Sequence, residues 1–330
     1  MSGNELSLIA DIGGTNARFA LVDGSSNQAR NPLTLACADY PDIVQAIQAY
    51  LRRVASDMPI HAAIAIATPV TRDRLVMTNH VWDFSVSETR EALGLRSLKV
   101  INDYAALALA LPILPPHELV KVGGGVAVEG QPMAVLGPGT GLGVSGVFPV
   151  ADFWYPLQSE GGHVSYGPLD AREASVIDII RKSYEHVSIE TLVSGPGLSL
   201  LFDALSTFEE GSSRKLPPSE IVRLAMDQSS VLAAEALSMF CGILGTAAGN
   251  LALTLGAHGG VFIGGGIIPR VLDFFQQSSF RRRFEQHGRF TRYLANIPTH
   301  VIVADYPALL GAAVSLQPQY QELGVSSVDA

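Results

Sequence analysis

The chain has 330 residues, of which 48% are hydrophobic, so it is long enough to form two domains with separate cores. Its 31 acidic and 22 basic side chains give a net charge of −9, which disfavours nucleic-acid backbones and anionic membrane surfaces as partners. The only two cysteines, Cys37 and Cys241, exclude a disulfide framework or a cysteine-rich metal site and favour a reduced, cytoplasmic setting.

Strand-like and helix-like segments alternate along the chain, which predicts an α/β fold with mostly parallel sheets. In the first half we expect strands at residues 6–12, 17–22, 61–68 and 98–103 and helices at 42–54, 85–93 and 105–111. Ser85 and Glu88 form a capping-box pair that opens the second of these helices. In the second half we expect strands at 133–137, 144–150, 260–264 and 300–304 and helices at 171–184, 198–207, 219–226, 230–255 and 308–316, before a polar tail. The proline- and glycine-rich stretch 114–130 is the expected crossing between two domains.

One segment is apolar enough to be tested as a membrane span. No Asp, Glu, Lys or Arg occurs between Ala236 and Pro269, and Gly245 and Gly249 form a GxxxG pair within it. A span needs about 20 predominantly apolar residues, and residues 237–255 nearly meet that length. Polar side chains interrupt the segment and a glycine-rich strand pattern follows at once, so the sequence predicts a buried core helix.

The first glycine turn lies in Asp11-Ile-Gly-Gly-Thr-Asn16, between two strands that form a predicted hairpin. Gly13 and Gly14 allow backbone N–H groups to approach phosphate oxygens, and Thr15 and Asn16 add side-chain donors. Asp11 can bind Mg²⁺ directly or through water, because this ion prefers hard oxygen ligands. A tight Gly-Gly hairpin without any ligand is the alternative at this point.

A formal dinucleotide-binding pattern, Gly141, Gly143 and Gly146, begins in the second glycine turn, residues 137–143. That pattern requires a helix to begin within it, whereas residues 144–150 are rich in strand-forming residues, so a second phosphate loop is the simpler interpretation. A third glycine run, residues 264–266 with Gly265 at its centre, ends a strand and precedes a helix, which is a common place for a nucleotide.

Polar side chains that suit a polyhydroxylated ligand occur at three places. Asn102 and Asp103 end an apolar strand, Glu160 and His163 lie on a glycine-containing loop, and Glu190 precedes a glycine-proline turn. A buried sugar needs several paired donors and acceptors, because each hydroxyl must be satisfied. Taken singly, each residue also has an ordinary interpretation: Asp103 as a helix cap, His163 as a loop histidine and Glu190 as a surface charge.

With these motifs in order along nearly the whole chain, the sequence resembles the bacterial glucokinase family, in the zinc-free glucokinase branch of the actin-like, sugar-kinase and heat-shock ATPase superfamily. The motifs that carry the resemblance are DIGGTNAR at 11–18, MTNH at 77–80, IND at 101–103, GTGLG at 139–143, EGGH at 160–163, LVSGPG at 192–197 and GGVFIGGGII at 259–268. Ala10 stands where relatives often have glycine, and the cysteine-rich zinc motif of the repressor-and-kinase branch is absent.

The resemblance implies a two-domain actin-like ATPase (ribonuclease H-like) α/β fold with a cleft between a small domain, residues 1–113 with about 305–330, and a large domain, residues 114–304. It implies ATP and Mg²⁺ as cofactors and glucose as substrate, with Asp103 as catalytic base. The implied sugar contacts are Asn102, Asp103, Glu160, His163 and Glu190. The expected ATP contacts are Ala10, Asp11, Ile12, Gly13, Gly14, Thr15, Asn16, Gly139, Thr140, Gly141 and Gly265, with Asp11 also as the Mg²⁺ ligand.

The sequence therefore predicts a cytoplasmic glucokinase that transfers the γ-phosphoryl group of ATP to the 6-hydroxyl of glucose. A kinase for another hexose, such as mannose, fructose or an amino sugar, and a non-catalytic sugar-sensing regulator are the alternatives. We expect neither nucleic acid nor membrane as a partner, and we expect a homodimer, because two-fold symmetric assemblies are common among soluble enzymes.

Overall fold

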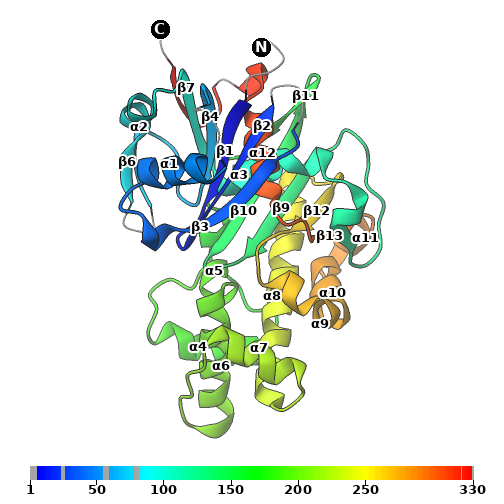
Figure 1. The fold of residues 1–330 in the computed structure, drawn as a ribbon. Coiled ribbons are helices and arrows are strands. Elements are labelled where there is room, and N and C mark those ends of the chain that lie inside the picture. The colour runs from blue at the N-terminus through cyan, green and yellow to red at the C-terminus, as the bar shows by residue number, and fades with distance from the viewer. Residues whose placement is uncertain (1–5, 24–26, 55–58, 78–81, 321, 329–330) are drawn as a thin grey trace. The chain divides into compact units, whose positions relative to one another are not determined.

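The computed structural model of the protein describes residues 6–23, 27–54, 59–77, 82–320 and 322–328 (Figure 1). The chain divides into two units: unit 1 contains Met1–Leu114, Val150–Gln158 and Ala304–Ala330, and unit 2 contains Pro115–Pro149 and Ser159–Val303. Unit 1 includes the segment 150–158, which the predicted small domain, residues 1–113 with about 305–330, does not. This segment packs in unit 1 through Phe153. Its ring meets Tyr320 edge-on, with ring centroids 5.9 Å apart.

Unit 1 is built on a six-stranded sheet in which β1, β4 and β7 run parallel to one another. The strand order is β14-β7-β4-β1-β2-β3. The bounds are β1 Leu6–Ile12, β2 Asn16–Asp23, β3 Arg30–Ala36, β4 His61–Ile66, β7 Ser97–Asn102 and β14 Val325–Val328, with a separate hairpin of β5 Arg74–Val76 and β6 Asp83–Ser85. The predicted strands 6–12, 61–68 and 98–103 are thus confirmed to within a few residues.

Helices cover both faces of this sheet because alternate residues of each strand point to opposite sides. Leu8 belongs to one apolar core and its neighbour Ile9 to the other. The helices are α1 Ile43–Arg53 and α2 Val86–Leu93 on the first face and α3 Asp103–Ala110 and α12 Pro307–Ser315 on the second (Figure 1). As the sequence predicts, Ser85 caps α2, accepting the Glu88 N–H at 3.1 Å.

The C-terminal part of the chain completes unit 1 around the β7–α3 connection. The tail that the sequence predicted to be merely polar contains β14, which pairs antiparallel with β7, so that Val325 lies opposite Val100. On the other face the Lys99 ammonium group is buried and donates to the Ser315 carbonyl at 2.8 Å and to the Tyr320 carbonyl. Burial lowers the pKa of Lys99 to about 8.

Helix α12 packs against α3 at a point where a side chain cannot be accommodated. A Cβ built on Gly311 would lie 1.6 Å from the carbonyl oxygen of Ala106. The close approach of the two helices therefore depends on glycine at this position, although glycine inside a helix costs about 1 kcal/mol relative to alanine.

Replacing Gly311 with alanine is expected to lower the stability of unit 1 by about 1–3 kcal/mol, because the helices must separate. Helix propensity alone predicts the opposite sign, so thermal denaturation of the variant distinguishes the two effects. Gly167→Ala is the matched control, since Gly167 is exposed and has no atom within 4 Å of an added Cβ. A Gly311→Ala protein as stable as the wild type would show that the helices approach less closely than described.

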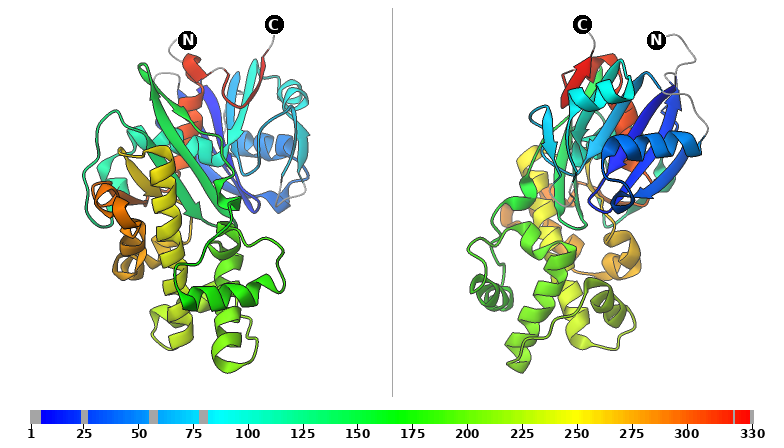
Figure 2. Two further views of the ribbon diagram at one scale, coloured as in Figure 1. Left: turned by 180° about the vertical axis from the view of Figure 1, so that it is seen from behind. Right: turned by 60° about the vertical axis from the view of Figure 1, so that its left-hand side comes forward.

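Unit 2 contains a second mixed sheet and most of the helices. Within unit 2 the strand order is β10-β9-β12-β13-β8, with bounds β8 Leu119–Lys121, β9 Met133–Pro138, β10 Leu142–Val150, β12 Gly260–Ile263 and β13 Thr299–Ile302. Strand β11, Phe153–Pro156, lies in the segment 150–158 of unit 1. The helices are α4 Ala171–Arg181, α5 Ile189–Leu192, α6 Gly195–Glu210, α7 Pro218–Met226, α8 Val231–Leu255, α9 Leu272–Gln277, α10 Phe280–Glu285 and α11 Thr291–Ala295 (Figure 2). The segment after the second glycine turn is strand β10, so the helix that a dinucleotide fingerprint requires is replaced by a strand.

The long apolar helix α8 is packed inside unit 2, where it contacts α6, α7 and α10. By length and composition it could cross a membrane, but 67% of its most apolar window is buried in the structure. The GxxxG pair has a packing role here. A Cβ on Gly245 would lie 2.3 Å from the Phe280 carbonyl oxygen, and one on Gly249 would lie 2.6 Å from that of Phe284. The two glycines thus let α10 lie against α8, and the predicted core helix is confirmed.

A buried polar network joins helices α4, α8 and α10. Arg283 donates to the Glu173 carboxylate at 2.5 and 3.2 Å, to the Thr246 hydroxyl at 3.0 and 3.1 Å and to the Tyr166 hydroxyl at 3.0 Å. The Tyr166 hydroxyl in turn donates to Glu173 at 2.9 Å. Each of the four side chains is therefore satisfied by the others, as a buried ion pair requires.

Candidate active site

The predicted site residues fall into one group in each unit, and the group in unit 1 begins at the β1–β2 turn. The Gly13 N–H donates to the Asn16 carbonyl at 3.0 Å, and the Cys37 N–H donates to the Thr15 carbonyl at 2.9 Å. Thr15 is exposed, and Gly13, Gly14 and Asn16 are partly exposed, whereas Ala10 and Ile12 are fully buried. Ala10 and Ile12 therefore present no exposed atoms to a ligand in this structure.

Asp11 is paired with Arg18 directly across the hairpin. The two residues are register partners in the antiparallel β1–β2 ladder, and the Arg18 Nη1 lies 2.9 Å from the Asp11 Oδ2. Burial raises the pKa of Asp11, and the Arg18 guanidinium opposes that shift. Sequence reasoning included both residues in one motif but missed their pairing, which the hairpin register determines.

The ends of the parallel strands bring the second part of this group to the same edge of the sheet. Ile12, Ile66 and Asn102 are consecutive register partners across β1, β4 and β7. Asn102 is the last residue of β7 and caps α3 by accepting the Tyr104 and Ala105 N–H groups at 2.9 and 3.1 Å. The cap interpretation considered for Asp103 thus belongs to Asn102.

Asp103 begins α3 and is half-buried, with Oδ1 accepting the Tyr104 N–H at 2.9 Å. Burial raises the pKa of the Tyr104 hydroxyl, and the carboxylates of Asp103 and Asp11 raise it further. Both carboxylates therefore act on the same phenol. Unit 1 collects two acidic groups beside the first glycine turn, which is the arrangement that a base and a metal-ligand role require.

The group in unit 2 begins at the β9–β10 turn, where three segments meet. The Gly139 N–H donates to the Gly141 carbonyl and the Gly195 N–H donates to the Gly139 carbonyl, both at 2.8 Å. The Gly264 N–H donates to the Leu136 carbonyl at 2.9 Å, which places Gly265 beside the same turn. Thr140 is exposed at its tip. The N-terminus of α6, capped by Ser194, is an addition that the sequence signalled only as a turn.

Two of the three sugar-contact candidates of unit 2, Glu160 and Glu190, lie on either side of the ring of the third, His163. Nδ1 lies 3.7 Å from the Glu190 Oε1, and Nε2 lies 4.0 Å from the Glu160 Oε2. Glu160 and His163 are exposed, and Glu190 is partly exposed. Two carboxylates and an imidazole thus offer a set of acceptors and donors to a polyhydroxylated ligand.

The described site residues suit Mg²⁺ only if a bound substrate supplies most of the ligands of the ion. Among the described residues no group of three or more His, Cys, Asp or Glu side chains could hold a metal. Asp11 presents a single carboxylate that already bonds Arg18. Mg²⁺ commonly uses one or two carboxylates together with phosphate oxygens and water, and Asp11 suits that arrangement.

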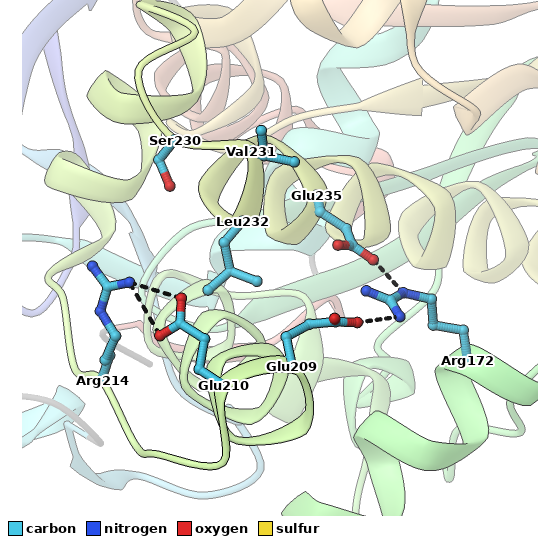
Figure 3. Close-up of a pocket in the computed structure, with 8 residues that line it drawn as sticks. All are labelled: Arg172, Glu209, Glu210, Arg214, Ser230, Val231, Leu232 and Glu235. Atoms are coloured by element: carbon cyan, nitrogen blue, oxygen red, sulfur yellow. Dashed lines mark hydrogen bonds and ion pairs between the residues drawn. The ribbon is translucent and has the colours of Figure 1, made fainter.

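An open pocket elsewhere in unit 2 has a volume of about 370 Å³ (Figure 3). It is lined by Arg172, Glu209, Glu210, Arg214, Ser230, Val231, Leu232 and Glu235, none of which is a predicted site residue. Arg172 bonds Glu209 and Glu235, and Arg214 bonds Glu210, so the guanidinium groups drawn there are already paired. We therefore assign this pocket no part in the candidate active site.

Comparison with known proteins decides the family. A model of the glucokinase family matches residues 8–319. The chain is 51% identical over 312 residues to a glucokinase from Aromatoleum aromaticum, covering 94% of each chain. The chain belongs to the glucokinase family. The family assignment made from the motifs is thereby confirmed.

Two further relatives of this glucokinase-family chain bear on its architecture. It is 49% identical over 313 residues to a "Bifunctional protein glk" from Paraburkholderia xenovorans, covering 94% of this chain but only about half, 49%, of that relative's length. A crystal structure of a glucokinase from an Antarctic psychrotroph superimposes with a TM-score of 0.85 at 38% identity, covering 94% of this chain and 98% of that one. The predicted two-domain, actin-like α/β fold is confirmed.

Proposed function

We propose that the protein is an ATP-dependent glucokinase that converts glucose to glucose 6-phosphate, with Asp103 as the catalytic base. The observation that carries the proposal is the convergence of Glu160 and Glu190 on His163 in a chain of the glucokinase family. Relatives at about 50% identity named glucokinase support the same reaction.

In the proposed reaction Asp103 accepts a hydrogen bond from the 6-hydroxyl of glucose. The hydroxyl oxygen forms a bond to the γ-phosphorus of ATP as the bond from that phosphorus to the β,γ-bridging oxygen breaks. The proton passes to the Asp103 carboxylate, and ADP leaves. Phosphoryl transfer has a loose transition state, so that positioning and charge neutralisation provide most of the acceleration.

The other residues act by binding and orientation. Asn102, Glu160, His163 and Glu190 hold the remaining hydroxyls, and well-oriented reactants can lower the barrier by about 7–11 kcal/mol. The phosphates lie against the turns 10–16 and 139–141 and near Gly265. Asp11 is the residue that would hold Mg²⁺, directly or through water, and the ion would supply charge neutralisation at the phosphate oxygens.

The proposal extends to the setting of the enzyme. We propose a cytoplasmic location, glucose and ATP as small-molecule partners, no nucleic-acid or membrane partner, and a homodimer. The net charge of −9 supports the exclusion of polyanionic partners. Analytical ultracentrifugation at micromolar concentration tests the homodimer independently of activity.

The decisive experiment measures ADP release from ATP and Mg²⁺ with glucose, mannose, fructose, galactose or N-acetylglucosamine as acceptor. Glucose is expected to stimulate release most strongly, and the product is expected to be phosphorylated at its 6-hydroxyl by ³¹P NMR. Faster turnover of another sugar would change the substrate and retain the mechanism. Binding of both ATP and glucose without sugar-stimulated ADP release would contradict the kinase function and favour a sensor.

A further inference from the structure

Glu190 contacts both the sugar-binding group and the second glycine turn within unit 2. Its Oε1 lies 3.7 Å from the Nδ1 of His163, and its Oε2 accepts the backbone N–H of Leu142 at 2.7 Å. Leu142 is the first residue of β10, directly after Gly141. A single carboxylate thus joins the two ligand-binding regions of this unit.

The contact with the turn is tightly packed. A Cβ on Gly141 would lie 2.4 Å from the Glu190 Oε2, and a Cβ on Gly162 would lie 2.2 Å from the Leu142 carbonyl oxygen. Leu142 is therefore held at its N–H by Glu190 and approached at its carbonyl by the residue that precedes His163. A shift of either sugar-binding segment therefore acts on the backbone of Leu142, through its N–H or through its carbonyl.

Backbone hydrogen bonds connect the peptide between Gly141 and Leu142 to the turn residues that are proposed to face the phosphates. The Gly139 N–H donates to the Gly141 carbonyl, and the Gly139 carbonyl accepts the Gly195 N–H at the start of α6, each at 2.8 Å. The peptide groups from 139 to 142 are consequently fixed relative to one another and to the helix N-terminus. The Glu190 side chain is partly exposed, so a ligand can contact the carboxylate that holds this arrangement.

We propose that Glu190 couples the two substrates, so that bound sugar raises the affinity of the second glycine turn for nucleotide phosphates. The coupling rests on the proposed function. Sugar hydroxyls that donate to Glu190 fix its rotamer, and the fixed carboxylate holds the Leu142 N–H and orders the turn. Nucleotide binding after sugar then has less ordering entropy to lose. Glu190 acts on the nucleotide as a positioning residue, through Leu142.

The effect is measured as a ratio of dissociation constants. The non-hydrolysable analogue adenylyl imidodiphosphate with Mg²⁺ is titrated by calorimetry, without glucose and with saturating glucose. Coupling factors between sites are typically about 5–150-fold, and we expect the wild-type ratio to fall within that range. By linkage, the analogue must strengthen glucose binding by the same factor, which provides an internal check.

Two variants at Glu190 and one at His163 separate coupling from simple contact with sugar. Glu190→Met has no acceptor for the Leu142 N–H, and its ratio is expected to fall to about 1. Glu190→Gln retains a neutral acceptor, which is roughly half as strong as a charged one, so an intermediate ratio is expected. His163→Gln is expected to weaken glucose binding but to keep the wild-type ratio, because no bond from His163 to the turn is recorded in the described part of the chain.

The outcomes are distinct. A wild-type ratio of 1, a Glu190→Met ratio equal to that of the wild type, or an equal loss in His163→Gln would overturn the coupling. If Glu190→Met does not fold, as judged by its thermal transition, Glu190→Gln decides alone. Failure of the proposed function looks different: no sugar then stimulates ADP release in the wild-type protein, whatever the ratio of dissociation constants.

Discussion

Replacing Asp103 with asparagine is expected to lower kcat by about 10²–10⁴-fold, the range that general-base catalysis usually contributes. Asparagine has the same shape and keeps an oxygen that can accept the Tyr104 N–H now bonded at 2.9 Å, so α3 should begin as before. It cannot take the proton of the 6-hydroxyl at ordinary pH. The loss corresponds to a barrier about 3–5 kcal/mol higher, since each tenfold change in rate is about 1.36 kcal/mol.

The measurement is kcat for glucose phosphorylation together with the glucose dissociation constant from calorimetry. The dissociation constant is expected to change by less than about threefold, because a hydroxyl can still donate to the amide oxygen. Asp11→Asn is the matched control, since it removes one carboxylate from the same edge of the sheet. That variant is expected to need more Mg²⁺ for half-maximal rate and to bind glucose normally. An Asp103→Asn enzyme with wild-type kcat would remove Asp103 from the base role.

Replacing Arg283 with methionine is expected to destabilise unit 2 by about 3–5 kcal/mol, the usual effect of removing one partner of a buried ion pair. The Glu173 side chain is 4% exposed, and without Arg283 its charge would be buried with the Tyr166 hydroxyl and the Leu169 N–H as its donors. Methionine fills much of the vacated volume, so that the lost charge pairing dominates over a cavity.

Differential scanning calorimetry gives the shift in the thermal transition of this unit. Arg282→Met is the matched control on the same helix, because Arg282 is exposed, and its effect is expected to stay within about 0.5 kcal/mol. The double variant Glu173→Met with Arg283→Met should recover part of the loss, since no charge is then left unpaired. Equal stability of the Arg282 and Arg283 variants would mean that the pair contributes nothing measurable.

The elements that local sequence patterns determine were predicted well. Helix α8 was predicted within one residue at its start, because it combines a Ser230 cap with a long apolar run. The strand that follows the second glycine turn was predicted against a competing motif, because residues 144–150 favour strand. Ser85 was correctly identified as the cap of α2. In each case the information lies within a few residues of the element.

The features that were missed depend on partners far away in the chain. Strand β14 consists of Val-Ser-Ser-Val, and its pairing with β7, more than 200 residues earlier, makes it a strand. The Asp11–Arg18 pair follows from hairpin register, and residues 150–158 join unit 1 through the contact of Phe153 with Tyr320. Glu190 was named from its motif, but its bond to the Leu142 N–H could not be inferred from sequence spacing.

The discontinuity of unit 1 has a consequence for how the chain is made on the ribosome. Strand β7 and helix α3, which carry Asn102 and Asp103, emerge long before α12 and β14, which pack beside them. At a synthesis rate of about 5–20 residues per second, the interval between residues 114 and 307 lasts roughly 10–40 s. During that time, while all of unit 2 is being synthesised, the apolar face of α3 and the edge of β7 lack their native cover. The segment that carries Asp103, the proposed catalytic base, is thus synthesised early and covered late, and its apolar surface is open to chaperones during the interval.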